Sequence, residues 1–295
     1  MTAAHLAQYR KGQMQVAIAA LFWSTGGLLV RLIDADDWTI IFWRSAFAVG
    51  FLICVLLVRE RTNMLKSVRQ IGWPGVLVSL CFAIDTILFV FALNKTSVAN
   101  VLIMFSTAPF WAALLAWIVL KETVPVRTRL AMVASVAGII IMVSDSFGTS
   151  SIVGDVMALG IAMLFAVPVV TIRRHPEIRM MPAVAVAAVL AVIFASPFAL
   201  ITGNSAGDMG LMAIFGILEY GIALVLFTAG ARYIPAAQSM LIGLLETVLG
   251  PVWVWLAVGE NPGVYTIAGG LVVLTALAVY AVRDMHVTRR VAPVI

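Results

Sequence analysis

Three carboxylates, Asp85, Glu219 and Glu246, lie inside long apolar stretches of the sequence. A charge at the centre of a bilayer costs at least ~2.5 kcal/mol, so each acid needs a partner, a proton or a water-filled cavity. We expect no intramembrane lysine or arginine to pair them, because Arg31 and Arg44 are expected nearer the outer rim, in structural ion pairs or snorkelling. The sequence therefore favours a shared aqueous cavity for an amine or a proton. The alternative is that each acid is protonated or hydrogen-bonded and only joins helices.

Helical spacing places polar and aromatic residues on common faces of three predicted helices, one of which carries Glu246. Three such stripes are Gln238, Ser239, Glu246, Gly250 and Trp253; Asn100, Met104, Thr107 and Trp111; and Trp23 beside Ser24, Gly27 and Arg31. Facing stripes of polar atoms, small residues and aromatic rings suit a cavity for a small amphipathic solute. The alternative is that Trp111 and Trp253 face lipid.

Histidines and motifs that would support other chemistry are missing from the apolar stretches, and the two cysteines there stand alone. The histidines, His5, His175 and His286, all lie outside them, and Cys54 and Cys81 form no CxxC motif. The sequence also contains no P-loop, HExxH or GxSxG motif. We therefore expect no catalytic residue, no metal site, no cofactor and no ATP-driven pumping by this chain alone.

The composition indicates a membrane protein. Of the 295 residues, 63% are hydrophobic and 11% are charged, whereas soluble domains carry about 25% charged residues. A soluble fold could not hide that much apolar surface. The formal charge of +5 forms no basic patch on any plausible soluble domain, so we expect no nucleic-acid partner.

A helix needs about twenty apolar residues to cross a bilayer. Ten stretches meet this requirement, at about 13–33, 38–58, 71–92, 97–120, 128–146, 153–172, 182–202, 209–230, 236–257 and 263–282. The first follows Arg10 and Lys11 and is longer than the apolar region of a cleavable signal, so we expect it to be retained.

The distribution of basic residues predicts the orientation. With the N-terminus in the cytoplasm, all but three of the 19 lysines and arginines fall on the cytoplasmic side, the exceptions being Arg31, Arg44 and Lys95. Because cytoplasmic loops carry the excess of basic residues, this alternation supports ten helices with both termini cytoplasmic. We expect the protein in the bacterial inner (plasma) membrane.

The two halves of the sequence are weakly similar at an offset of 138 residues. The offset aligns Ala99-Asn100 with Ala237-Gln238, Trp117 with Trp255, and Glu122 with Glu260. An odd number of helices in each repeat inverts the second copy. We predict an all-α membrane protein of ten transmembrane helices, arranged as two inverted five-helix repeats, 1–146 and 147–295, around a central cavity.

These residues carry a resemblance to a known family. The segment Thr96–Glu122, with Pro109-Phe110-Trp111 at its middle, resembles the helix 4 signature of EamA-type members of the drug/metabolite transporter superfamily, and the segment Pro235–Glu260 repeats it. Residues Leu245–Trp255 are similar to the amino-acid exporter branch, which includes the aromatic amino-acid exporters. Thr247 stands where many relatives have proline.

The resemblance implies a secondary carrier or facilitator that exports small metabolites through a cavity formed by helices of both halves. Together with the stripes, it gives as substrate-binding candidates Trp23, Ser24, Asp85, Asn100, Glu219, Gln238, Glu246 and Trp253. Glu246 is the first candidate to meet a substrate amine or a coupling proton. The expected partners are a small-molecule substrate and the lipid bilayer.

The leading hypothesis is export of amino acids by alternating access. One alternative is an exporter or exchanger of another small metabolite or drug, although phosphorylated substrates would favour a basic cavity. Another is an intramembrane lipid-modifying enzyme, which would need a catalytic histidine or cysteine or an acidic metal motif.

Overall fold

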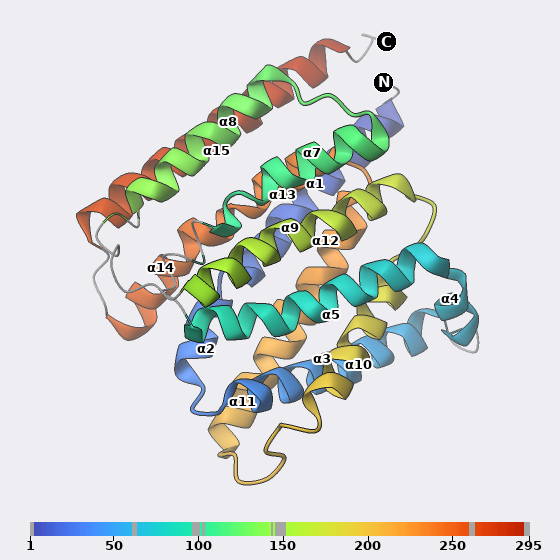
Figure 1. Cartoon of the computed structure of the whole chain (residues 1–295). Coiled ribbons are helices and arrows are strands. Elements are labelled where there is room, and N and C mark those ends of the chain that lie inside the picture. The colour runs from blue at the N-terminus through green and yellow to red at the C-terminus, as the bar shows by residue number, and fades with distance from the viewer. Residues whose placement is uncertain are drawn as a thin grey trace.

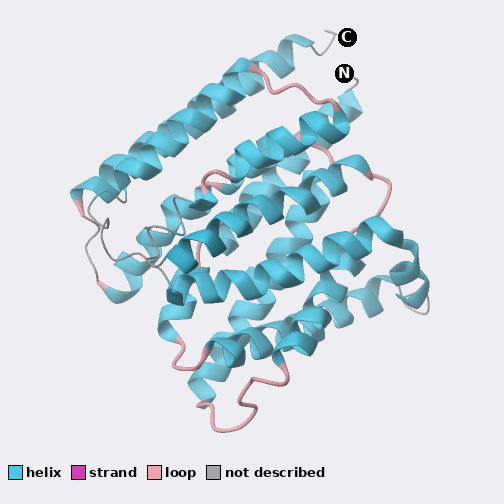
Figure 2. Cartoon of the chain, viewed as in Figure 1, coloured by secondary structure: helices cyan, strands magenta, loops and turns pink. Residues whose placement is uncertain are grey.

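The computed structural model describes residues 3–60, 64–95, 101, 104–142, 144, 152–259 and 263–291. Every regular element in these ranges is a helix (Figure 2). Helices form because lipid offers the backbone no hydrogen-bond partners, so each apolar segment must satisfy its own. By length and composition, seven helices in these ranges could cross a membrane, and two further apolar helices are shorter.

The helices of the first half run in chain order, and α1 and α2 together make its first crossing. They are α1 (Ala3–Trp23), α2 (Gly26–Leu32), α3 (Asp37–Glu60), α4 (Met64–Gln70), α5 (Gly72–Lys95), α7 (Ala108–Leu120) and α8 (Val126–Met142). The short helix α4 connects α3 with α5.

In the second half, two crossings are built from more than one element. The elements are α9 (Ile152–Arg174), α10 (Met181–Ala195), α11 (Ala206–Ile214), the π-helix η3 (Phe215–Ile222), α12 (Ala223–Ala231), α13 (Ala236–Gly243), α14 (Leu245–Val258) and α15 (Val264–Val291). The halves together supply ten helical segments, which confirms the all-α, ten-helix architecture.

The second half runs in the opposite direction to the first. Figure 1 shows the N- and C-termini at the same end of the molecule, with α1 leading away from that end and α9 leading back toward it. The first half contains five segments, and an odd number of crossings leaves the chain at the opposite end of the molecule. The second half therefore starts from that end.

The two halves are interleaved. The most extensive helix contacts join one half to the other: α5 with α9 and α10, α3 with α10 and η3, α1 with α12, α7 with α9 and α13, and α8 with α15. Figure 1 shows α8 and α15 as a pair along one edge. Neither half therefore builds a core without the other.

Glycines allow two of these pairs to approach closely. A Cβ added at Gly269 in α15 would lie 2.2 Å from the carbonyl oxygen of Gly138 in α8, and one added at Gly230 in α12 would lie 2.6 Å from that of Gly12 in α1. Small residues at helix crossings are a common way to pack helices in lipid, where no hydrophobic effect drives them together.

Several helices differ from their predicted extents. Helix α10 ends at Ala195, well before residue 202, because Pro197 has no backbone N–H and disfavours helix in the residue before it. The stretches expected as continuous helices at 13–33 and 236–257 are each broken, the first at Ser24-Thr25 and the second at Leu244.

Candidate functional site: a charged cluster between the halves

The break between α1 and α2 is held by local hydrogen bonds. The hydroxyl of Ser24 donates to the carbonyl of Leu21 at 2.6 Å, and that of Thr25 donates to the carbonyl of Phe22 at 2.7 Å. Breaking a helix inside a membrane frees backbone carbonyls, and these side chains satisfy two of them. Discontinuous helices often form the binding sites of transporters.

Corresponding breaks occur in both halves. A turn at Ser106-Thr107 precedes α7, and Leu244 separates α13 from α14, which is the same place at an offset of 138 residues. Both α7 and α14 then end on a left-handed residue, Lys121 with φ 57° and Gly259 with φ 74°, again 138 residues apart. The two halves thus share these structural features although their sequences match only weakly.

Two tryptophans are anchored at these breaks. The indole N–H of Trp253 in α14 donates to the Ser24 hydroxyl at 2.7 Å. That of Trp111 in α7 donates to the Thr107 hydroxyl at 3.1 Å. Each indole is therefore hydrogen-bonded to a residue at a helix break. These bonds account for the positions of both rings without the alternative that they only face lipid.

A buried ion pair joins the halves. The guanidinium of Arg44 in α3 lies 3.2 Å from the carboxylate of Glu219 in η3, and the two side chains are 4% and 8% exposed. The same guanidinium lies 4.2 Å from the centre of the Phe215 ring and 5.4 Å from that of Tyr220. The π-helical turn therefore supplies both an opposite charge and aromatic faces to one cation.

Glycines bring these elements together. A Cβ added at Gly216 in η3 would lie 2.0 Å from the carbonyl oxygen of Arg44, so only glycine permits this approach of η3 to α3. A Cβ added at Gly26 in α2 would lie 3.3 Å from the Oε1 atom of Glu219. Glu219 therefore lies beside the α1–α2 break, where Ser24 accepts the hydrogen bond from Trp253.

This arrangement corrects one expectation from the sequence. Glu219 does have an intramembrane basic partner, because Arg44 is buried against η3 instead of reaching the outer rim. The reason is the close packing of α3 on η3, which the sequence alone does not reveal. The sequence feature that could have indicated a buried partner was Arg44 itself, an isolated arginine inside the apolar stretch 38–58.

The other two acids lie in the same region. Asp85 in α5 and Glu246 in α14 are partly buried, and both lie within electrostatic range of Glu219. Asp85 also interacts with Arg44. The Oδ1 atom of Asp85 and the Nε and Nη1 atoms of Arg44 are buried without a hydrogen-bond partner among the described residues. Because buried polar atoms are nearly always bonded, these atoms mark a place for a polar ligand or water.

The remaining candidates make other contacts. Trp23 packs in an aromatic cluster, with ring centres 5.7 Å from Phe165 and 5.0 Å from Phe227. Gln238 is buried near the end of the molecule that carries the termini, where it accepts a hydrogen bond of 2.7 Å from Tyr9. Asn100 lies outside the described residues.

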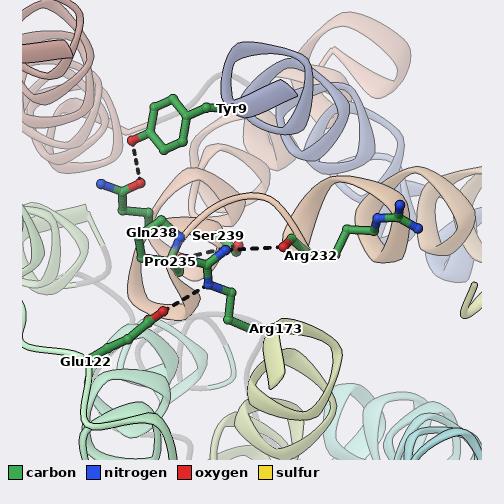
Figure 3. Close-up of polar contacts among 7 residues, drawn as sticks. All are labelled: Tyr9, Glu122, Arg173, Arg232, Pro235, Gln238 and Ser239. Carbon is green, nitrogen blue, oxygen red and sulfur yellow. Dashed lines mark hydrogen bonds and ion pairs between the residues drawn. The ribbon is translucent and has the colours of Figure 1, made fainter. Parts of the chain in front are cut away.

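Figure 3 shows a second polar group around Gln238, also built from both halves. The Nε of Arg173, at the end of α9, donates to Glu122 after α7 at 2.9 Å. Its Nη1 donates to the carbonyl of Arg232, which follows α12, at 3.2 Å. These contacts tie three helices together at the terminus-bearing end. Across the part of the chain that the structure covers, no three histidine, cysteine or acidic side chains gather as metal ligands.

Comparisons with known proteins agree with this architecture. The model of the EamA-like transporter family matches the chain twice, over residues 10–144 and 152–282. The chain is 27% identical over 280 residues to the uncharacterized transporter YwfM of Bacillus subtilis, covering 88% of this chain and 92% of that protein. It is 25% identical over 278 residues to the pseudopaline exporter CntI of Pseudomonas aeruginosa, covering 90% and 94%. A solved crystal structure with 17% identity superposes with a TM-score of 0.78, covering 96% of this chain and 99% of that one, which shows a shared fold.

Proposed function

Because the chain belongs to the EamA-like transporter family, we propose that it exports small zwitterionic metabolites, most concretely amino acids, by alternating access through a central cavity between its halves. It is a multi-pass membrane transporter of small molecules and not an enzyme. We propose further that the repeats meet near residues 146 and 147, and that the protein lies in the bacterial inner membrane with both termini cytoplasmic, as the excess of basic residues on that side favours.

One observation carries the substrate proposal. Arg44 and Asp85 come from the first half and Glu219 and Glu246 from the second; Arg44 pairs with Glu219, and the other two acids lie within electrostatic range of that pair or of Glu219. An amino acid carries one carboxylate and one ammonium group, which such a set of charges can pair simultaneously. Charge-assisted hydrogen bonds are about twice as strong as neutral ones, so they suit recognition of a small solute.

The roles follow from the charges. The carboxylates attract the ammonium group, with Glu246 the first to meet it because Arg44 already neutralises Glu219. The two unbonded guanidinium nitrogens of Arg44 attract the carboxylate. The bond between Ser24 and Trp253 lies beside Glu219, and we assign these two residues to the polar and aromatic wall of the cavity.

The pseudopaline exporter among the relatives supports export as the direction of transport. The buried arginine also favours a second class of substrate, anionic metabolites. The sequence alone argues against this class, because it predicts no intramembrane cation to pair the acids. Three acidic side chains and one arginine lie in this region, so acidic groups outnumber basic ones and the zwitterion is the better fit.

Transport by purified protein tests the proposal. Liposomes containing the protein would be loaded with single radiolabelled amino acids, or with a sugar phosphate, and efflux measured with and without a pH gradient. We expect at least one amino acid to leave faster than from protein-free liposomes, and the sugar phosphate to be retained. If no amino acid moves faster, the proposed substrate class is wrong. Flux that ignores the pH gradient identifies facilitated diffusion instead of proton coupling.

A further inference from the structure

A groove of about 460 Å³ runs between α8 and α15, away from the central cluster. Its lining includes Arg127 and Arg283 at one end and, further along, the side chains of Leu130, Leu271, Thr275 and Tyr280. The two helices are antiparallel, so the start of α8 and the later turns of α15 meet at the end of the molecule that carries the termini (Figure 1).

The groove has a charged end and an apolar remainder. Arg127 is half-buried and Arg283 is exposed, so both can reach a ligand at the membrane surface. Deeper in the membrane, Leu130 and Leu271 are about 60% exposed along the groove. At that depth the solvent is hydrocarbon, and an unfilled groove forfeits the contacts of its lining atoms.

We propose that this groove is a binding site for an anionic phospholipid of the leaflet on the side of the termini. The acyl chain fills the apolar part, and the phosphate lies between the two arginines. Charge complementarity selects the headgroup, since basic pockets between transmembrane helices on the cytoplasmic side bind anionic lipid headgroups. The site lies outside the central cluster, so the proposal is independent of the transported substrate.

The site would also stabilise the fold locally. Helix α15 packs mainly on α8, through the close crossing at Gly138 and Gly269, and has few contacts with other helices. A lipid that touches both helices and neutralises their arginines would hold this edge pair in place. Bound lipid should therefore raise the thermal stability of the whole protein.

Lipid binding to the full-length protein in detergent tests the proposal, by native mass spectrometry and by thermal unfolding. The probes are phosphatidylglycerol, phosphatidylcholine with the same acyl chains, and inorganic phosphate. We expect phosphatidylglycerol to be retained and to raise Tm. The paired variant Arg127→Gln with Arg283→Gln should bind it roughly 25-fold more weakly, at about fivefold for each arginine. Arg129→Gln, which removes an exposed arginine that does not line the groove, is the matched control and should bind normally.

Two further variants keep the test decisive if the paired glutamine variant folds poorly. Arg127→Lys with Arg283→Lys retains both charges and should retain phosphatidylglycerol. Ala134→Leu fills the groove without changing charge and should weaken binding of the lipid. Equal retention of both lipids, an equal Tm increase with inorganic phosphate, or a dimer that the groove variants convert to monomer would each overturn the proposal.

Discussion

The guanidinium of Arg44 and the carboxylate of Glu219 form an ion pair of 3.2 Å between residues 175 positions apart in the chain. Both side chains are nearly fully buried. Removing one charge leaves the other uncompensated, so Arg44→Gln and Glu219→Gln should each destabilise the protein by about 3–5 kcal/mol. Thermal unfolding in detergent measures this loss.

A double replacement provides the control for this pair. Arg44→Met combined with Glu219→Leu removes both charges of the pair and should cost less than the two single glutamine changes added together. A Glu219→Gln protein as stable as wild type would show that the pair does not hold the halves together.

The bond from Trp253 to Ser24 should matter for substrate binding. Trp253→Phe keeps the ring but removes the donor, and Ser24→Ala removes the acceptor, so each should raise KM roughly two- to tenfold. Combining both changes should add little, because they remove the same bond. The matched control is Trp255→Phe, two residues away and 45% exposed, which should leave KM unchanged. Additive effects in the double variant would argue against the bond.

The crossing of α8 and α15 leaves no room for a side chain. Gly269→Ala would place a Cβ 2.2 Å from the carbonyl oxygen of Gly138, so the helices must separate. We expect a destabilisation of about 1–3 kcal/mol, as for other overpacked sites. Gly210→Ala is the control, since its Cβ would meet no described atom within 4 Å. Thermal unfolding should show a lower Tm for the first variant only.

The ion pair between Arg173 and Glu122 should restrict access at the terminus-bearing end. Both side chains are 28% exposed, so Glu122→Gln should change stability by at most about 1 kcal/mol. It should nevertheless open the polar group shown in Figure 3. Ser239→Cys, buried in α13, should then react faster with a membrane-impermeant thiol reagent, in a protein with both native cysteines replaced by serine. Identical labelling rates with and without Glu122 would contradict this role.

Much of the fold could be predicted from the sequence, because lipid requires long apolar helices and basic residues bias their orientation. The breaks could not be predicted. Ser24-Thr25 and Ser106-Thr107 are also compatible with continuous helices, and the sequence does not reveal the local hydroxyl bonds or the tertiary Trp253 bond found at the first break. The π-helix η3 likewise depends on packing of Gly216 against α3.

Part of the candidate site could be predicted from the sequence. Asp85, Glu219 and Glu246 were found from the cost of a charge in lipid, and the structure brings them into electrostatic range. The expected position of Arg44 was wrong. Hydropathy indicates how deep a residue lies in the membrane, but not which neighbouring helix its own helix packs against. Gln238 shares a stripe with Glu246, yet its bond to Tyr9 depends on how α13 meets α1.

Efflux by Glu246→Gln tests the central claim most directly. Glutamine keeps the size of the side chain and removes its charge, so a substrate ammonium loses a charge-assisted bond worth about 1.5–3 kcal/mol. Glu177→Gln is the matched control in the loop after α9. A hydrogen bond from its own backbone N–H lowers the pKa of Glu177, and His175 lowers it less strongly. This exposed carboxylate is therefore ionised at neutral pH. We predict that Glu246→Gln inserts normally but exports amino acids roughly tenfold or more slowly, while Glu177→Gln matches wild type. Wild-type efflux by Glu246→Gln would contradict the account.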